Sequence, residues 1–583
     1  MATYLLGISA FYHDSAAALL ADDKIIAAAQ EERFTRKKND PGFPAHAIRY
    51  VLEEAGIDYT EISAIAFYDK PLLKFERLLQ TYHAFAPLGV RSFAKAMPAW
   101  MKEKLLLRSF LRKQLRSFGR QHPPLLFPEH HLSHAASAYY PSPFEEAAVL
   151  TIDGVGEWAT TAICHASPDE LKVLKELRFP HSVGLLYSAF TYYLGFKVNS
   201  GEYKLMGLAA YGNSDGMETM TFKEKICNEL VDIREDGSIL LNMHYFDFAT
   251  GSVMTKNRKW EKLFGLSRRL PESEIRQQHK DLALAIQQVT ESIVLSLART
   301  AQQLTGSKHL VMAGGVALNC VANSRIAEAG LFEKIWIQPA AGDAGGALGA
   351  AYAAWHIGYG QGKLPNEGRD RMGGAFLGPG YTDGEIGQVI RRQKVGYRYF
   401  NDFRQLAMLV SQKLAEGQVV GWFQDRMEFG PRALGNRSIL ADPRNPAMQQ
   451  RLNEKIKFRE EFRPFAPAVL EEDLTLYFTT NEVSPYMLRV AEVQEAQRSG
   501  LPAITHVDAS ARIQTVNWEG QPKFWMLINE FKKLTGCSLL INTSFNVRGE
   551  PIVCSPEDAW QGFVRTGMDC LVMGNYFIEK APR

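Results

Sequence analysis

A meander of strands occurs twice in this chain, and this repeat constrains its fold more than any other sequence feature. The first copy spans residues 4–29 and consists of three predicted strands joined by short polar turns. The second copy begins with a predicted strand over residues 147–152, turns at Asp153 and Gly154, and returns over residues 159–165. Two such copies predict an α/β domain built from two similar halves.

The length of the chain requires more than one domain. One hydrophobic core rarely grows beyond about 250–300 residues, and this chain has 583, of which 46% are hydrophobic. The duplicated meander resembles the core of the actin-like (ASKHA) ATPase fold. Glycine is dense and periodicity is lost over residues 358–380, which predicts a domain boundary near residue 363. We therefore expect an actin-like domain over residues 1–362 and an α/β or α+β domain over residues 363–583.

Charge and cysteine content restrict the partners and the compartment. Lys and Arg total 66 and Asp and Glu total 64, so a net charge of +2 predicts neither nucleic acid nor a membrane as a partner. The six cysteines form no CxxC pair, which argues against a zinc ribbon or a disulfide framework. The N-terminus lacks the features of a signal peptide, and no apolar stretch of about 18 residues predicts a membrane span. We expect a cytoplasmic protein.

Residues 102–120 are a local exception to this neutrality. They are rich in Lys and Arg, and their apolar residues recur at helical spacing. Such a helix can bind RNA or a membrane surface, or it can pack its apolar face against the rest of the protein. We favour the packed helix, because the chain as a whole is nearly neutral.

Two histidines four residues apart indicate a metal site. On a helix, His130 and His134 share one face and can bind a single ion. Asp153 at a strand end and Asp343 in a glycine-rich loop add carboxylates where an actin-like fold brings its turns together. Such a donor set suits Fe(II), Mn(II) or Zn(II). The alternatives are a solvated histidine pair, an Asp153 that only ends its strand and an Asp343 that caps a helix.

His13 lies in the first predicted turn, beside Asp14 and Ser15. A histidine can accept a proton from a hydroxyl group near neutral pH, and a tight turn at the mouth of a cleft would present it to a substrate. His13 is therefore a candidate general base, with a purely structural histidine as the alternative.

Cationic residues gather beside glycine and proline turns in the C-terminal half. Arginine holds phosphate or carboxylate with two parallel hydrogen bonds, whereas lysine acts as a point charge. One such arginine could equally form a surface salt bridge, but their coincidence with turns favours an anion site. The predicted site consists of Arg432, Lys457, Arg463, Arg512, Ser544 and Asn546.

Seven motifs resemble those of the O-carbamoyltransferases of the nodulation-protein and antibiotic-tailoring type. The resemblance covers nearly the whole chain. The motifs are FYHDSA at 11–16, EERFTR at 31–36, HHLSHAASA at 130–138, GEYKLMGL at 201–208, GGVALN at 314–319, GPRALG at 430–435 and NTSFN at 542–546.

The resemblance implies an actin-like domain, similar to the tRNA threonylcarbamoyl transferase subunit, joined to a YrdC-like domain, similar to threonylcarbamoyl-adenylate synthase. In such enzymes carbamoyl phosphate and ATP, with Mg(II), give carbamoyl adenylate in the C-terminal domain. The N-terminal domain then transfers the carbamoyl group to a hydroxyl group of the acceptor.

The motifs also imply roles for individual residues. The six C-terminal residues would bind carbamoyl phosphate and the ATP phosphates, and His13 would be the catalytic base. The implied Fe(II) ligands are His130, His134, Asp153 and Asp343. The implied nucleotide contacts of the N-terminal domain are Gly154, Gly314, Gly315 and Asn319.

Three other functions are consistent with parts of this pattern. A tRNA threonylcarbamoyladenosine-type transferase has the same kinds of domain, but RNA binding usually needs a basic face. The hydrogenase-maturation carbamoyltransferase carries zinc-finger cysteine pairs that this chain lacks. A non-enzymatic actin-like nucleotide switch leaves the clustered arginines unexplained. The sequence does not identify the hydroxyl acceptor, because an aminoglycoside, an oligosaccharide, a macrolactam and an alkaloid would all offer a hydroxyl group. It also leaves open the choice between monomer and homodimer.

Overall fold

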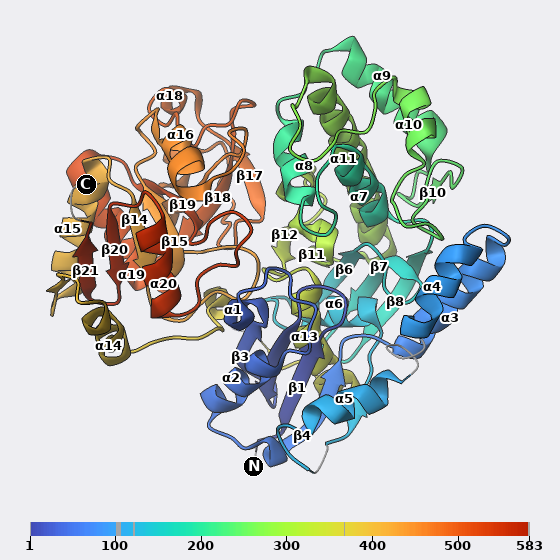
Figure 1. The fold of residues 1–583 in the computed structure, drawn as a ribbon, viewed down its shortest axis with the longest axis horizontal. Coiled ribbons are helices and arrows are strands. Elements are labelled where there is room, and N and C mark those ends of the chain that lie inside the picture. The colour runs from blue at the N-terminus through green and yellow to red at the C-terminus, as the bar shows by residue number, and fades with distance from the viewer. Residues whose placement is uncertain (1, 101–105, 121–122, 366–367, 581–583) are drawn as a thin grey trace. The chain divides into compact units, whose positions relative to one another are not determined.

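The chain is divided into two units in a computed structural model, which describes residues 2–100, 106–120, 123–365 and 368–580. Unit 1 comprises Met1–Glu31 and Pro41–Arg371, and unit 2 comprises Glu32–Asp40 and Met372–Arg583. Figure 1 shows the elements of both units in chain order.

Unit 1 contains two five-stranded sheets with one topology, in the orders β3-β2-β1-β4-β5 and β8-β7-β6-β11-β12. In each sheet the central strand is antiparallel to the strand that follows it in the chain and parallel to the strand on its other side. The predicted duplication and the α/β class are therefore confirmed. The strands are β1 Tyr4–Ser9, β2 Ala16–Ala21, β3 Lys24–Gln30, β4 Ile62–Phe67, β5 Leu125–Leu126, β6 Ala147–Ile152, β7 Ala159–Ala166, β8 Leu171–Arg178, β11 His309–Ala313 and β12 Lys334–Ile337.

Two helices connect the sheets of unit 1. α13 (Asp343–Tyr352) packs on β1 and β2, α6 (His130–Tyr139) packs on β6 and β11, and the two helices pack against each other. Glycine makes this approach possible, because a Cβ atom on Gly349 would lie 1.7 Å from the carbonyl oxygen of Ser133. The small residues of α13 therefore bring a loop from each sheet close to the same point.

Of the remaining helices, α2 packs on β2 and β3, and α11 packs on β6 and β7. α11 is long and apolar enough to cross a membrane by length and composition, but 67% of its most apolar window is buried inside the protein, as in a core helix. The helices are α2 Ala45–Ala55, α3 Pro71–Ala84, α4 Val90–Trp100, α5 Leu107–Leu115, α7 Val183–Tyr193, α8 Glu202–Ala209, α9 Met217–Lys225, α10 Asn257–Phe264, α11 Gln277–Thr305 and α12 Cys320–Glu328.

The predicted basic helix is observed as α5. Its side chains Leu107, Leu111 and Leu115 are buried, so one face of the helix packs on unit 1, as expected. Residues 102–105 of the predicted helix lie outside the described residues.

Unit 1 continues beyond the predicted boundary at residue 363. The ammonium group of Lys363 donates hydrogen bonds to the carbonyl oxygens of Tyr139 (2.9 Å), Ser142 (3.1 Å) and Phe144 (2.6 Å). Arg371 forms an ion pair with Asp23. These buried contacts hold the glycine-rich segment against unit 1, so the loss of periodicity marks an irregular but attached segment.

Unit 2 is built on a nine-stranded mixed sheet of order β13-β21-β20-β14-β15-β19-β16-β18-β17. The pairs β14–β20 and β16–β18 are parallel, and the other pairs are antiparallel. The likeness to a YrdC-like domain stays a prediction. The strands are β13 Arg398–Tyr399, β14 Val420–Phe423, β15 Arg437–Ala441, β16 Ala466–Leu470, β17 Arg489–Glu492, β18 Ser510–Val516, β19 Leu539–Ser544, β20 Cys570–Met573 and β21 Tyr576–Glu579.

Helices pack on this sheet, with α19 against β16 and β19 and α20 against β14 and β20. The helices of unit 2 are α1 Glu32–Thr35, α14 Asp383–Gln393, α15 Phe403–Ala415, α16 Met448–Leu452, α17 Leu474–Tyr477, α18 Glu495–Arg498, α19 Pro522–Thr535 and α20 Pro556–Arg565.

A short piece of the N-terminal sequence belongs to unit 2. The guanidinium group of Arg33 donates to the carbonyl oxygen of Gly430 at 2.7 Å, and that of Arg36 donates to those of Pro551 and Ile552 at 2.9 and 2.6 Å. Residues 32–40 thus complete a domain that the sequence predicted to begin at residue 363.

Candidate active site

α6 carries two of the predicted metal ligands at its start. The carboxylate of Glu157 accepts hydrogen bonds from the backbone N–H groups of His130 (3.0 Å) and Lys70 (2.7 Å). A carboxylate at this position satisfies an N–H group that has no partner within the helix, and its negative charge interacts favourably with the helix dipole. Glu157 therefore fixes the end of the helix that presents His130 and His134.

Four predicted ligands converge in unit 1. His130 Nε2 lies 2.9 Å from Asp153 Oδ2, 3.1 Å from His134 Nε2 and 3.8 Å from Asp343 Oδ1. His134 Nε2 lies 3.6 Å from Asp153 Oδ2 and 3.8 Å from Asp343 Oδ1. One ligand atom from each side chain lies within 4.8 Å of the other three. The sequence prediction that these four residues meet is therefore confirmed, while their function as ligands stays a prediction.

The spacing of these atoms fits one transition-metal ion. Histidine nitrogen and carboxylate oxygen bind such ions at about 2.0–2.2 Å, so two ligand atoms of one ion lie roughly 3–4 Å apart. The separations of 2.9–3.8 Å agree with this value. A set of two nitrogen and two oxygen donors suits Fe(II), Mn(II) and Zn(II) and does not select among them.

Neighbouring groups orient the two carboxylates. Asp343 is the first residue of α13, directly after the N-cap residue Gly342. Its Oδ2 accepts a hydrogen bond from the hydroxyl group of Tyr68 at 3.3 Å. Oδ1 of Asp153 accepts from the N–H of Gly315 at 3.0 Å. Gly314 has a φ of +91°, and a Cβ atom there would lie 2.3 Å from the carbonyl oxygen of Ile152. Glycine at this position lets the loop approach the end of β6.

The pKa shifts of His130 and Asp153 favour the protonation states that bind a metal, whereas the shift of Asp343 favours its protonated form. Burial lowers the pKa of His130 well below its usual value, so the imidazole is neutral. Burial disfavours an ionised Asp153, but hydrogen bonds from His130 and His134 outweigh burial and hold the pKa of Asp153 well below its usual value. Burial raises the pKa of Asp343. Neutral imidazole and ionised carboxylate are the metal-binding forms.

His13 lies beside this cluster in the turn after β1. Its Nδ1 is 3.1 Å from Asp14 Oδ2, and its Nε2 is 3.8 Å from Asp343 Oδ2. Burial alone would lower the pKa of His13, but the carboxylates of Asp343 and Asp14 outweigh burial and raise it to about 9. A cation bound at Asp343 would oppose this field and favour the neutral imidazole that a general base requires.

Three of the four predicted nucleotide contacts, Gly154, Gly314 and Gly315, lie beside Asp153 or the end of β6. The carbonyl oxygen of Gly154 accepts a hydrogen bond from the hydroxyl group of Ser182 at 2.7 Å. Asn319 has a different environment, because its Oδ1 caps α12 at the N–H of Ala322 (3.1 Å) and its amide pairs with that of Gln287 at 3.1 and 3.2 Å. Asn319 therefore braces the loop that carries Gly314 and Gly315.

Two cations near the cluster were not predicted from the sequence. Lys74 and Arg77 lie three residues apart on α3, and Lys74 forms a 2.5 Å ion pair with Asp69 while Arg77 donates to the carbonyl oxygen of Gly156 at 3.0 Å. The charge of Lys74 contributes to lowering the pKa of His130. The spacing of Lys74 and Arg77 on one helix face was the available signal, but it does not reveal which element that face covers.

In unit 2, three of the six predicted anion-binding residues form one hydrogen-bonded group. The ammonium group of Lys457 donates to the carbonyl oxygen (2.6 Å) and hydroxyl group (3.2 Å) of Ser544 and to the side-chain oxygen of Asn546 (2.7 Å). Burial and the charges of Arg459, Arg463 and Lys38 lower the pKa of Lys457 well below its usual value. The recorded partners of Lys457 are neutral, so a bound anion would stabilise its charged form.

The other predicted residues lie on neighbouring elements of unit 2. Arg463 is 3.6 Å from Glu460 and acts electrostatically on Lys457. Arg512 lies in β18, in a sheet whose order is β19-β16-β18 at this point. Arg432 lies in the loop before β15. Lys457, Ser544 and Asn546 are in direct contact, whereas Arg512 lies on β18 and Arg432 lies in the loop before β15.

The loop that carries Arg432 is shaped by a buried glutamate. Oε1 of Glu428 accepts from the N–H groups of Leu434 (2.7 Å), Asn436 (2.9 Å) and Arg437 (3.2 Å). Arg437, five residues after Arg432, is fully buried and donates to backbone carbonyl oxygens, including that of Pro379 at 2.9 Å. Arg437 is therefore part of the core of unit 2.

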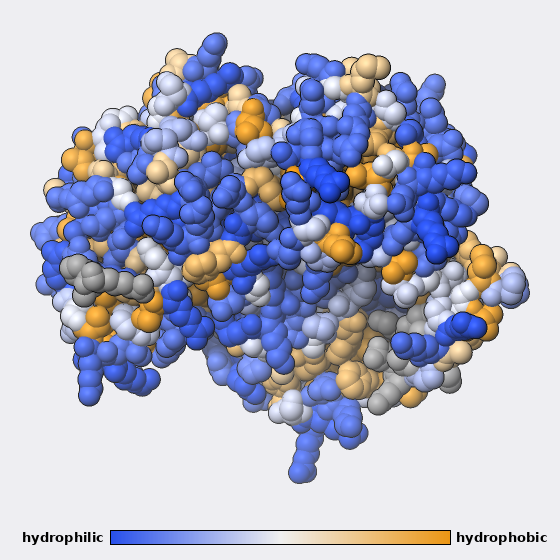
Figure 2. Space-filling model, turned by 45° about the horizontal axis from the view of Figure 1, so that its top comes forward, coloured by the Kyte–Doolittle hydropathy of each residue, from blue (hydrophilic) through white to orange (hydrophobic). Residues whose placement is uncertain are grey.

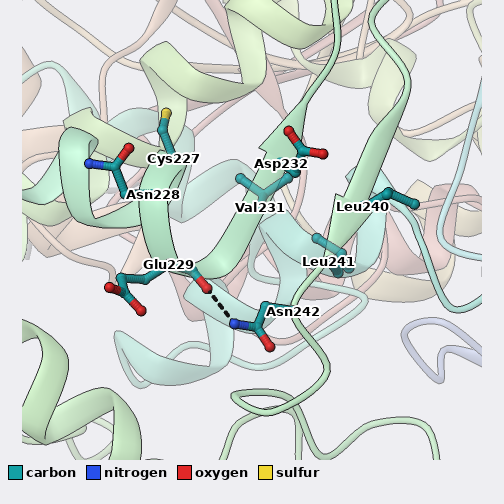
Figure 3. Close-up of a pocket in the computed structure, with 8 residues that line it drawn as sticks. All are labelled: Cys227, Asn228, Glu229, Val231, Asp232, Leu240, Leu241 and Asn242. Carbon is teal, nitrogen blue, oxygen red and sulfur yellow. Dashed lines mark hydrogen bonds between the residues drawn. The ribbon is translucent and has the colours of Figure 1, made fainter.

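A surface pocket of about 540 Å³ lies elsewhere in unit 1, on the segment from Cys227 to Asn242. Figure 3 shows its lining, with the side chain of Asn242 donating to the carbonyl oxygen of Glu229 at 2.9 Å. None of its lining residues belongs to a predicted site, and burial raises the pKa of Cys227. Size alone therefore does not make this pocket the active site.

The comparisons with known proteins cover both units. A family model described as the carbamoyltransferase N-terminus matches residues 4–352, and one described as the carbamoyltransferase C-terminus matches residues 411–580. The protein sll1178 of Synechocystis sp. is 54% identical, with 100% of this chain and 97% of that protein covered. Nodulation protein NolNO of Sinorhizobium fredii is 38% identical, with 98% and 80% covered. The 3'-hydroxymethylcephem-O-carbamoyltransferase of Amycolatopsis lactamdurans is 35% identical, with 50% and 53% covered.

Proposed function

This chain belongs to the carbamoyltransferase family, and from that premise we propose that it is an ATP-dependent O-carbamoyltransferase with one reaction centre in each unit. The family establishes a transferase enzyme, which excludes the non-enzymatic switch. The observation that carries the proposal is the convergence of His130, His134, Asp153 and Asp343 beside His13.

The proposed chemistry has two stages. In unit 2, carbamoyl phosphate and water give carbamate and phosphate, and carbamate then attacks the α-phosphorus of ATP with Mg(II), which gives carbamoyl adenylate and pyrophosphate. In unit 1, the oxygen of an acceptor hydroxyl group attacks the carbamoyl carbon. The bond from that carbon to the phosphate oxygen breaks, and the products are a carbamate ester and AMP.

In unit 2 the cations supply electrostatic stabilisation of the first stage. Lys457 is buried, its hydrogen-bond acceptors are neutral oxygens, and three further cations act on it. A bound phosphate group would therefore stabilise its charged form. Arg463 is one of these cations and acts electrostatically on Lys457. We propose that Arg432 and Arg512 complete the anion site, each with two parallel hydrogen bonds to the anion. These charges would offset the negative charge that accumulates as carbamate approaches the nucleotide phosphate.

In unit 1 the chain's own residues bind the adenylate and move one proton. His130, His134, Asp153 and Asp343 would hold the ion, which when bound supplies Lewis-acid polarisation of phosphate oxygen. We propose that Lys74 and Arg77 attract the adenylate phosphate and that the backbone of Gly154, Gly314 and Gly315 admits the nucleotide, with Asn319 holding their loop. Nε2 of His13 would accept the proton of the acceptor hydroxyl group.

The acceptor is proposed by class only. One relative is named an O-carbamoyltransferase of 3'-hydroxymethylcephem, and others are named nodulation proteins, which supports a hydroxyl acceptor. Transfer of threonylcarbamoyl to tRNA is the second candidate that the sequence leaves open. A separate arm of the assay therefore supplies tRNA, threonine, bicarbonate and ATP.

The assay supplies the full chain with carbamoyl phosphate, ATP, Mg(II) and Fe(II). Pyrophosphate is measured without an acceptor, and AMP and carbamate ester are then measured with candidate alcohols. We expect pyrophosphate release to require carbamoyl phosphate and ester formation to require an alcohol. Absence of pyrophosphate release in the presence of carbamoyl phosphate would refute the first stage.

Two variants separate the centres. Arg463→Ala should abolish pyrophosphate release, whereas His130→Ala should retain it and lose ester formation. The matched controls are Arg392→Ala, at an exposed side chain that pairs with Glu557, and His165→Ala, at a half-buried side chain that pairs with Glu146. Equal loss of both stages in both variants would contradict separate centres, provided that circular dichroism shows a folded chain.

A further inference from the structure

Positive charge is concentrated in one segment of the chain, residues 91–120. Residues 91–120 contain nine Lys and Arg against one Glu, a net charge of +8, whereas the whole chain carries +2. All other residues together therefore carry −6. A near-neutral total conceals this separation, so the expectation that no polyanion is a partner does not apply to this segment.

The cations of α5 face solvent. Its leucines are buried against unit 1, while Arg108, Arg112 and Arg116 recur every four residues on an exposed face, and Lys113 and Arg120 are also exposed. Within the described part of the chain, none of these five cations forms an ion pair with a carboxylate. A row of exposed cations without acidic neighbours favours an anionic partner.

Exposed aliphatic side chains occur on the helices that precede α5 in the chain and directly before α5 itself. On α3 and the turn into α4, Leu72, Leu88 and Val90 are 62%, 61% and 60% exposed, and Leu106 just before α5 is 55% exposed. Figure 1 shows α3 and α4 side by side at one edge of unit 1 and α5 next to one end of this pair, and Figure 2 shows hydrophobic surface at that right-hand edge. These side chains are aliphatic, whereas nucleic-acid bases are bound by stacking on aromatic rings.

We propose that the α3–α5 surface, defined as residues 71–100 and 106–120, binds an anionic membrane. Cations attract the negatively charged headgroups, and exposed leucine and valine side chains enter the boundary between headgroups and acyl chains. Because Leu107, Leu111 and Leu115 are already buried in unit 1, α5 stays in the protein and the contact is peripheral. The occupant that the observations favour over RNA is therefore a lipid surface.

α5 also contacts the turn that carries His13. The ring centroids of Phe110 on α5 and Phe11 lie 5.3 Å apart. On the proposed function, which this step assumes, a membrane bound at α5 would present hydroxyl groups of membrane-anchored acceptors near His13. Vesicle binding itself needs neither carbamoyl phosphate nor ATP, so its result is independent of that function.

The test is flotation of the full chain with vesicles. We expect binding to vesicles of phosphatidylcholine with 30% phosphatidylglycerol at about 0.1 M salt, no binding to pure phosphatidylcholine, and release at about 1 M salt, where the Debye length is near 3 Å. The triple variant Arg108→Gln, Arg112→Gln, Arg116→Gln should bind on the order of 100-fold more weakly. The control Lys172→Gln, Arg258→Gln, Lys262→Gln removes the same charge from exposed positions elsewhere in unit 1 and should bind like the wild type.

Further arms separate the occupants. Leu88→Ser with Val90→Ser should weaken vesicle binding about tenfold without changing pyrophosphate release. Equal binding of the triple variant and its control, or binding to neutral vesicles, would overturn the proposal. Binding of a fluorescent RNA, lost in the triple variant while anionic vesicles do not bind, would also overturn it and assign the surface to nucleic acid.

Discussion

At the residue scale, the orientation of Asp343 depends on one hydroxyl group. Tyr68 is buried and donates to the carboxylate at 3.3 Å. Groups that orient a metal ligand typically change metal affinity 10–100-fold when they are removed. Tyr68→Phe should therefore weaken metal binding by about that factor in a metal titration, with pyrophosphate release unchanged.

The matched control for Tyr68→Phe is Tyr59→Phe. Tyr59 is also buried, and its hydroxyl oxygen is buried without a hydrogen-bond partner in the described structure. Its removal deletes the same atom and should leave metal affinity unchanged. Similar losses in the two variants would show that the effect comes from repacking rather than from the bond to Asp343.

Lys363 makes stability depend on pH. Burial lowers its pKa from 10.5 to about 7. Between these values the unfolded chain binds a proton that the folded chain does not, so the free energy of unfolding rises with pH. From pH 7.5 to 9 the gain from Lys363 is about 2 kcal/mol. The melting temperature of the wild type should therefore exceed that of Lys363→Met by a margin that grows as the pH rises from 7.5 to 9.

The control for this exchange is Lys334→Met, at an exposed lysine. Its melting difference from the wild type should be the same at both pH values. Lys363→Met should also be less stable at pH 9, because three buried carbonyl oxygens lose their donor. A pH-independent difference for Lys363→Met would contradict a lowered pKa.

Residue type determined how much of the site could be predicted. His130, His134 and Asp343 were found because imidazoles at helical spacing and a carboxylate in a glycine loop are uncommon in a core. Tyr68 was not found, since a tyrosine at the end of an apolar strand looks like ordinary core. Lys74 needed knowledge of which helix face is covered, and that depends on tertiary structure.

At the element scale, the loop after β6 controls the position of α6. A Cβ atom on Gly156 would lie 3.0 Å from the Cβ atom of His130, which is closer than most packed contacts. Gly156→Ala should therefore shift the start of α6 and weaken metal binding about tenfold. The melting temperature should change little in comparison. The measurement is a metal titration beside a thermal melt.

Gly342→Ala is the control for this element. Gly342 precedes Asp343, has a φ of −74°, and a Cβ atom there meets nothing within 4 Å. This variant should bind metal like the wild type. If it weakens binding as much as Gly156→Ala, the helix contact at Gly156 is not the cause.

Elements with strong local patterns were predictable, and their attachment was not. The predicted strand at residues 147–152 has the observed bounds. Periodicity carries this information within the element itself. Residues 32–40 contain only one short helix, and their membership of unit 2 depends on carbonyl oxygens more than 390 residues away, such as that of Gly430, 397 residues from Arg33. No local pattern encodes such a partner.

At the scale of the whole molecule, the N-terminal sequence supports chemistry proposed for the C-terminal unit. Arg36 donates to the carbonyl oxygens of Pro551 and Ile552. The loop before them is tied to the anion site, because the amide of Asn546 donates to the carbonyl oxygen of Glu550 at 2.7 Å while its oxygen accepts from Lys457 at 2.7 Å. Arg36 is thus a positioning residue for Asn546.

Arg36→Met should therefore lower pyrophosphate release about tenfold, since a misplaced catalytic group commonly costs one to two orders of magnitude. Metal affinity of unit 1 should be unchanged. Arg36→Lys should recover little, because one ammonium group does not reproduce the two-point contact of guanidinium with both carbonyl oxygens. The control Arg49→Met removes an exposed arginine of α2 and should affect neither quantity. If Arg36→Met loses metal affinity but keeps pyrophosphate release, residues 32–40 support the metal site of unit 1 instead. That result would contradict the assignment of Arg36 as a positioning residue for Asn546.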